Sequence, residues 1–280
     1  MIRTTLLMLM ALLCLTACND DDYLPPYESS LVVEGWIEDG EFPVVMLSRT
    51  YPVMEEKTQV GDLSDYVLRW AVVTISCDDR SVVLTGMRDN NYFPPYIYTT
   101  GEMRGEAGKH YTLTVKYRQM YAEATTFIPP APQLEQLRVE PVAGEDTLRT
   151  LVAGFTDPAD EQNYYQFFVK KGKESSQYLA SYLGSVDDRS LNGYTEQTVY
   201  QGHKFPQKHY QPYFAVGDTI FVKLAQVDSN SYAFWSDYDK SLTLSNNMMY
   251  PKSTNLPSNI EGAIGYWCGM GSSTQSIVIK

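Results

Sequence analysis

Apolar and polar residues alternate along much of the chain with a period of two, the pattern of strands that bury one face. The clearest run is 111–118, where Tyr111, Leu113 and Val115 share one face and polar residues occupy the other. The dipeptide Asp39-Gly40 is a hairpin signal between two such runs. In the first half of the chain, the pattern predicts strands at 31–37, 42–48, 71–77, 81–85, 111–118 and 121–127.

The second half continues this alternation and adds one segment with a different period. Its strands are predicted at 134–139, 148–155, 163–170, 218–227 and 276–279, with short strands within the irregular stretch 172–215. Tyr232, Trp235 and Tyr238 recur at helical spacing near the C-terminus. They follow Ser229-Asn230-Ser231, which offers N-cap residues, so one short helix is predicted there. Long amphipathic helices do not alternate with the strands, which disfavours a parallel α/β fold and favours an all-β protein.

Three prolines within 129–132 mark the clearest boundary in the chain. A run of this composition forms a stiff, extended spacer. About a hundred residues precede it, which is the size of a small β-sandwich domain. We therefore expect two tandem β-sandwich domains, immunoglobulin-like or fibronectin type III-like, at 30–128 and 134–280. A Pro-rich linker at 129–133 would join them.

The first residues carry the features of a bacterial lipoprotein signal. Arg3 is followed by the apolar run 6–15, which is too short to span a bilayer of about 30 Å as a helix. Leu15-Thr16-Ala17-Cys18 closes this run as a lipobox. We expect residues 1–17 to be a cleaved signal peptide and Cys18 to carry the acyl chains of a stable anchor. An ordinary signal with an incidental cysteine is the alternative.

The residues after Cys18 indicate where this anchor holds the protein. Asn19 stands where an Asp would retain an enteric-type lipoprotein at the inner membrane. The acidic run Asp20-Asp21-Asp22 resembles the surface-export signal of Bacteroidota lipoproteins, although a solvated tether at 18–29 would explain it as well. We therefore expect an outer-membrane lipoprotein, displayed at the cell surface rather than on the periplasmic face.

Charge and cysteine usage narrow the possible partners. The formal net charge is −12, which argues against nucleic acid and against electrostatic binding to anionic lipid. Of the four cysteines, Cys14 leaves with the signal peptide and Cys18 is lipidated. Cys77 and Cys268 remain, and an exported protein can either pair such residues or bury them as free thiols.

The sequence contains none of the motifs G-x-S-x-G, H-E-x-x-H, G-x-G-x-x-G or the P-loop. His203 and His209 share one loop but lack identifiable further ligands, so neither metal nor cofactor is predicted. Carboxylates in the second half could act as a glycosidase acid and base or bind calcium. They are Asp157, Asp160, Glu161, Asp187, Asp188, Asp237 and Asp239. For the first three, a turn initiated by Asp157-Pro158 is the simpler explanation.

Tyrosine is the compositional anomaly, with 22 residues in the chain. Each tyrosine offers an aromatic face and a hydroxyl at little entropic cost, which suits sugars, peptides or protein partners. Many must instead fill the core, Tyr165 in particular. The irregular stretch 178–213 is the best place for a ligand-binding surface. Its candidate residues are Tyr178, Tyr182, Tyr194, Tyr200, Tyr210 and Tyr213.

Short motifs spread over nearly the whole chain together carry a resemblance to a known family. They are the lipobox with its acidic run, 31–37 (LVVEGWI), 44–48, 155–158 (FTDP), 163–165 (NYY), 246–247 (NN) and 255–267 (NLPSNIEGAIGYW). Together they resemble a Bacteroidota outer-membrane lipoprotein family of unknown function, from which Cys268 departs at a position where a small residue is expected. The resemblance implies no catalytic residues, but it implies an accessory role beside TonB-dependent receptors. Gly262 and Gly265 are expected at tight turns or close backbone approaches, and Asn259 is expected to bond local backbone.

Three functions are compatible with these features. The anchor, the sandwich domains and the tyrosine-rich loops favour a non-catalytic binding or accessory protein that works with a TonB-dependent receptor in nutrient uptake. The second possibility is a surface glycan or peptide hydrolase with two carboxylates about 5–9 Å apart in the C-terminal domain. The third is an adhesive or structural surface protein, for which a long exposed edge strand or a removable terminal strand is expected.

Overall fold

A computed structural model describes residues 29–50, 64–158, 161–172, 177–191, 193–203, 210–245 and 256–280. The predicted signal peptide, Cys18 and the tether up to residue 28 lie outside these ranges. Within them, strands dominate and one α-helix lies towards the C-terminus, which confirms the all-β, sandwich-like prediction. No helix in the described ranges is both long and apolar enough to cross a membrane.

The strands of the first half lie close to their predicted positions, apart from the short β5 and β6, which were not predicted. They are β1 (Leu31–Glu38), β2 (Val44–Arg49), β3 (Val72–Cys77), β4 (Arg80–Val83), β5 (Thr85–Met87), β6 (Ile97–Thr99), β7 (His110–Tyr117) and β8 (Met120–Phe127). The second half contains β9 (Leu134–Val142), β10 (Glu145–Asp157), β11 (Tyr164–Lys171), β12 (Leu179–Asp187), β13 (Gly193–Val199), β14 (Phe214–Ala215), β15 (Thr219–Val227), α2 (Ser229–Ser245) and β16 (Ile264–Val278). A 3₁₀ turn at Asp188–Ser190 follows β12.

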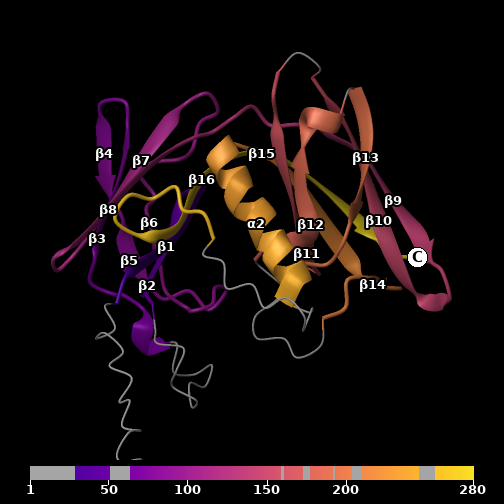
Figure 1. Ribbon diagram of the computed structural model, residues 1–280, viewed down its shortest axis with the longest axis horizontal. Coiled ribbons are helices and arrows are strands. Elements are labelled where there is room, and N and C mark those ends of the chain that lie inside the picture. Colours follow the sequence, from indigo (N-terminus) through magenta and orange to yellow (C-terminus); the bar gives the residue numbers. More distant parts are fainter. Residues whose placement is uncertain are drawn as a thin grey trace, which may run out of the picture.

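An eight-stranded sheet runs through both halves of the protein in the order β12-β11-β15-β16-β1-β2-β6-β5. A four-stranded sheet, β4-β3-β7-β8, packs on its N-terminal part. A second four-stranded sheet, in which β10 pairs with β13, β14 and β9, packs on its C-terminal part. The two sandwiches stand side by side, with α2 and β16 at the centre between them (Figure 1).

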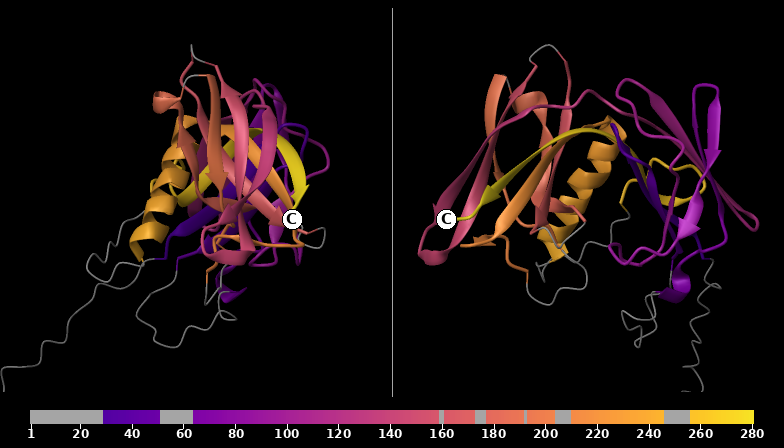
Figure 2. Two further views of the ribbon diagram at one scale, coloured as in Figure 1. Left: turned by 90° about the vertical axis from the view of Figure 1, so that its right-hand side faces the viewer. Right: turned by 180° about the vertical axis from the view of Figure 1, so that it is seen from behind.

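The strand β16 joins the two halves, so the domain division that we expected at 129–133 is wrong. Its first part, 264–270, pairs in parallel with β1, and its second part, 271–278, pairs antiparallel with β15. Seen from behind, this strand passes from the N-terminal sandwich to the C-terminal one (Figure 2). The segment 134–280 is therefore not a separate sandwich, because its last strand completes the N-terminal sheet. We predicted only 276–279 as a strand, since glycines interrupt the alternation of 264–275.

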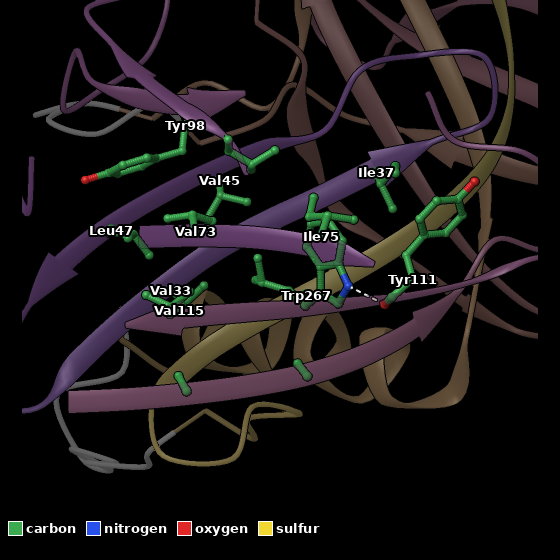
Figure 3. Packing of buried hydrophobic residues seen from close by; sticks show 14 of the residues in the cluster. Val33, Ile37, Val45, Leu47, Val73, Ile75, Tyr98, Tyr111, Val115 and Trp267 are labelled. Carbon is green, nitrogen blue, oxygen red and sulfur yellow. Dashed lines mark hydrogen bonds between the residues drawn. The ribbon is translucent and has the colours of Figure 1, made fainter. Parts of the chain in front are cut away.

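Both hydrophobic cores lie on the same side of the eight-stranded sheet. Odd-numbered residues of β16 point into them: Trp267 into the N-terminal core and Ile277 against the C-terminal core. Trp267 is fully buried among residues of β1, β3 and β7, and its indole Nε1 donates to the Tyr111 carbonyl at 2.8 Å (Figure 3). Even-numbered residues of β16, such as Tyr266 and Cys268, point to the opposite face, where α2 packs.

The Pro-rich linker crosses β16 between the two cores. A Cβ at Gly271 would lie 2.0 Å from the Pro129 carbonyl oxygen, so only glycine lets the linker backbone approach this closely. Beyond the linker, the Leu134 N–H donates to Ser273 Oγ at 2.9 Å, and Gln275 Nε2 donates to the Leu134 carbonyl. The linker is thus docked on the sheet along its length.

The helix α2 begins at Ser229, and its N-cap is Asp228 rather than a residue of 229–231 as predicted. Asp228 Oδ1 accepts from the Ser231 N–H at 2.7 Å, the bond that an N-cap side chain makes to the third helical residue. Its other oxygen, Oδ2, accepts from Thr126 Oγ1 at 2.7 Å. Thr126 Oγ1 in turn accepts from the Gly269 N–H at 2.7 Å. This chain of bonds ties the helix to β8 and β16.

The turn before β16 fulfils the roles predicted for three of its residues. Asn259 donates from Nδ2 to the Trp267 carbonyl at 2.7 Å and accepts the Trp267 N–H at 3.0 Å. Gly262 has φ +79°, and Gly265 has φ +126°. A Cβ at Gly265 would lie 1.8 Å from the Val33 carbonyl oxygen of the neighbouring strand. These residues shape the entry into β16, so their role is structural.

Candidate functional site

A pocket of about 810 Å³ opens on the face of the eight-stranded sheet that carries α2. Its floor consists of even-numbered residues of β1 and β16, which point away from the two cores. Small-molecule sites commonly have volumes of about 300–1,000 Å³, so this pocket is large enough for a drug-sized ligand. Its main lining residues are Glu34, Trp36, Glu38, Met46, Tyr92, Phe168, Tyr178, Lys223, Phe234, Trp235, Tyr238, Tyr266, Cys268 and Met270.

Aromatic rings form most of the pocket wall. The Tyr266 ring lies 4.6 Å from the Phe234 ring and 5.1 Å from the Trp235 ring, centroid to centroid. Across the floor, Trp36 is paired with the ring of Tyr92 at 6.0 Å. These rings come from β1, β16, α2 and the segment before β6, so the wall is assembled from both halves of the chain. Such surfaces favour ligands with an apolar body.

One end of the pocket holds a balanced pair of charges. Lys223 Nζ lies 2.5 Å from Glu38 Oε2, and both side chains are only 13% exposed. Ser272 Oγ donates to the second oxygen of Glu38. The Lys223 ammonium also lies 4.5 Å from the centre of the Tyr178 ring, a cation–π contact. These contacts leave no net charge for a ligand at this end.

Glu34 carries an unbalanced charge in the middle of the pocket. In the sheet register it lies between Met46 of β2 and Tyr266 of β16. Among the described residues, its carboxylate makes no hydrogen bond or ion pair. Solvent reaches the group through the pocket mouth, yet the surrounding protein raises the pKa of Glu34 by desolvation. Burial also raises the pKa of Tyr266, and the charge of Glu34 raises it further.

The two cysteines are free thiols buried in different clusters, so the disulfide alternative does not hold in this structure. Cys77 lies in the N-terminal core, and Cys268 lies under α2 at the pocket floor. Burial raises the pKa of Cys268 to about 12, and burial also raises the pKa of Cys77. Thiols held in the neutral form are poor nucleophiles, so both cysteines serve packing.

The structure separates the six candidate tyrosines into three places. Tyr178 lines the pocket. Tyr182, Tyr200, Tyr210 and Tyr213 form a cluster with successive ring centroids 5.7–6.2 Å apart. The His203 ring, which also lines the pocket, lies 5.5 Å from Tyr210 and connects this tyrosine cluster to it. Tyr194 is half exposed on the other sheet, where its hydroxyl donates to Gln136 Oε1 at 2.9 Å.

The buried carboxylates of the second half are held by structural partners. Asp157 accepts from the Tyr165 hydroxyl at 2.5 Å, which places Tyr165 in the core as expected. Asp188 accepts from the Asn163 N–H at the same end of the sandwich. Asp239 on α2 accepts the backbone N–H groups of Leu183 and Ser185 in β12, each at 3.2 Å.

The other described carboxylates of the predicted pairs either form short-range ion pairs or are exposed. Asp187 pairs with Arg189 at 2.7 Å, and Asp237 pairs with Lys240 at 2.7 Å. Glu161 is exposed. Asp160 and His209 lie outside the described residues. Within the described ranges, no group of three His, Cys, Asp or Glu residues is placed to hold a metal ion. The described carboxylates thus act locally, in turns, caps and helix docking.

The sequence analysis missed the residues at the centre of the pocket. It assigned 31–37 to a strand with one buried face, and that assignment already places Glu34 and Trp36 together on the opposite face. A carboxylate beside a tryptophan on the outer face of a strand could therefore have indicated this site from the sequence. Tyr266 could not be found in this way, because the strand that contains it was not predicted.

A comparison with known protein families gives a match over most of the chain. Residues 20–276 match the model of a family described as "Domain of unknown function (DUF4249)". None of the curated proteins matches the sequence. The match covers both sandwiches, all but the last two residues of β16, and the pocket between them.

Proposed function

Because the chain belongs to the DUF4249 family of unknown function, we propose a function from its own features: a lipid-anchored, non-catalytic ligand-binding protein of the outer membrane. The pocket on the eight-stranded sheet carries this proposal. It has the volume, the aromatic wall and the few polar groups that small-molecule sites share. The buried carboxylates that a hydrolase would need are instead engaged in turns and helix docking.

The anchor and the partner complete the proposal. The lipobox ending at Cys18 supports attachment through acyl chains, and the acidic run after it supports display at the cell surface of a Bacteroidota cell. The resemblance to lipoproteins found beside TonB-dependent receptors supports an accessory role in nutrient uptake. In this role the protein captures a ligand in the pocket and presents it to the receptor. Both halves of the chain build the pocket, so we assign capture to the joined sandwiches rather than to the C-terminal half alone.

A membrane experiment tests the anchor and the partner together. The full chain, tagged at its C-terminus, is expressed in its native host and purified from detergent-solubilised outer membranes. We expect a TonB-dependent receptor to co-purify with the wild-type protein in stoichiometric amounts. With Cys18→Ala, the protein should appear in the soluble fraction and lose the receptor. Recovery of the wild-type protein without any receptor, or unchanged membrane attachment of Cys18→Ala, would contradict the proposal. Protease added to intact cells reports whether the protein is on the outer face.

The adhesive alternative receives no support from the terminal strand. Adhesion by strand exchange requires a strand that can leave the edge of a sheet. The C-terminal strand β16 lies between β15 and β1, and it is paired along its whole length on one side or the other. Its removal would open both sandwiches.

A further inference from the structure

Among the described residues that form the pocket floor, one carboxylate has no cationic partner. Glu38 is neutralised by Lys223 in an ion pair that solvent barely reaches. Glu41 lies at the exposed rim, where water screens its charge. Glu34 remains, and its carboxylate has no cationic partner among the described residues. Glu34 is exposed to solvent, but the surrounding protein partly desolvates its carboxylate, and a positive group beside it would offset that cost.

The groups around Glu34 are those that attract organic cations. Tyr266 is its register partner on β16, and Trp36 lies two residues along the same face of β1. Trp235 packs against Tyr266 from the helix. The faces of tryptophan and tyrosine rings carry negative potential, and they bind ammonium groups best when water is excluded. A positive group beside Glu34 would therefore meet a carboxylate and aromatic faces at once.

We propose that this pocket binds a small ligand with an amine or quaternary ammonium group on an apolar body, with Glu34 as the counter-ion. The inference rests on the proposed ligand-binding function and names the class of ligand. The apolar body lies along the wall formed by Phe168, Phe234 and Met270. An anionic ligand is disfavoured, because Lys223, the only lysine among the described lining residues, is already paired with Glu38.

Binding to the purified full-length mature protein tests this class directly. The probes are benzyltrimethylammonium, benzyl alcohol and benzoate, which share a ring and differ in charge. Isothermal titration at pH 7.5 and low salt should give a dissociation constant for the cation at least tenfold below those of the other two. Glu34→Gln should weaken cation binding at least tenfold and leave benzyl alcohol within about twofold. Glu145→Gln removes the same charge on β10, away from the pocket, and should change nothing.

Three results would overturn the inference: equal binding of the three probes, no binding of the cation, or full cation binding by Glu34→Gln. Circular dichroism of each variant shows that it is folded, so a loss of binding reports the site. The receptor experiment is independent of this outcome. If the receptor co-purifies but the cation does not bind, the ligand class is wrong and the accessory role stands. If the cation binds but no receptor co-purifies, the pocket chemistry stands and the receptor partnership fails.

Discussion

Replacing Trp267 by Ala tests whether the N-terminal core depends on the C-terminal strand. The indole is fully buried in that core, between the sheet that contains β1 and the sheet that contains β3 and β7 (Figure 3). Its Nε1 donates to the Tyr111 carbonyl at 2.8 Å. Because Trp267 is supplied by β16, its loss should destabilise residues that precede the linker.

The expected loss follows from burial and from the hydrogen bond. Truncating a buried tryptophan to alanine costs about 3–5 kcal/mol in transfer and cavity energy. Leaving the Tyr111 carbonyl without its donor adds about 1–3 kcal/mol. The sum, about 4–8 kcal/mol, is comparable with the whole stability of a typical domain, which is about 5–15 kcal/mol. Trp267→Phe keeps an aromatic ring but loses the hydrogen bond, so we expect a loss of about 1–3 kcal/mol.

Urea titration followed by far-UV circular dichroism measures these losses, and hydrogen exchange with mass spectrometry locates them. Exchange should accelerate in β1 and β7 when Trp267 is replaced. Trp70 is the matched control, because it lies in the same half with 88% of its surface exposed. Trp70→Ala should change stability by less than about 0.5 kcal/mol. A loss below about 1 kcal/mol for Trp267→Ala, or faster exchange confined to the C-terminal sandwich, would refute the dependence of the first core on β16.

Three further substitutions test the charges and the close packing. Partial desolvation by the surrounding protein raises the folded-state pKa of the exposed Glu34 above its ordinary value of 4.5, so ionisation costs stability as pH rises through that value. Glu34→Gln should therefore raise the melting temperature at pH 7.5, with no difference near pH 4; no gain at pH 7.5 would contradict the raised pKa. Asp239→Ala should cost about 2–4 kcal/mol in urea titration, because two N–H groups of β12 lose their acceptor, whereas surface Asp237→Ala should cost less than about 0.5 kcal/mol. Gly271→Ala should cost at least about 1–3 kcal/mol through contact with the linker, whereas Gly101→Ala, which has open space, should be nearly neutral in the same titration.

The regular strands could be predicted because their alternation is local. Each of 31–37, 71–77 and 111–118 buries every second residue against one core, and the structure keeps these strands with small shifts at their ends. The helix was likewise predicted from its period. Its cap was assigned wrongly: the N-cap bond is made by Asp228, which directly follows the predicted strand 218–227 and precedes the predicted candidates 229–231.

The strand β16 could not be predicted because its residues pack against several other segments, on both faces and along its backbone. Close approaches require glycine at three positions: β1 lies against Gly265, the end of β8 against Gly269 and the linker against Gly271. These glycines interrupt the apolar pattern of a strand. Cys268 and Met270 on one face and Trp267 on the other are all buried, so the first part of the strand shows no polar side. The parallel pairing with β1 is a contact between distant segments, which local patterning does not report.

The location of the pocket follows from the continuity of β16. Its register runs without a break through both pairings, so its odd-numbered residues face both cores and its even-numbered residues share the opposite face. That face carries α2, and the space beside this helix is the pocket. Glu34 and Trp36 line it from the N-terminal half, and Phe168 and Trp235 line it from the C-terminal half. A ligand that fills the pocket therefore contacts both sandwiches. Such a ligand binds only when β16 is paired with β1, because the two halves build the pocket together. The pairing therefore favours ligand binding, and by linkage the bound ligand stabilises the β1–β16 pairing by the same free energy.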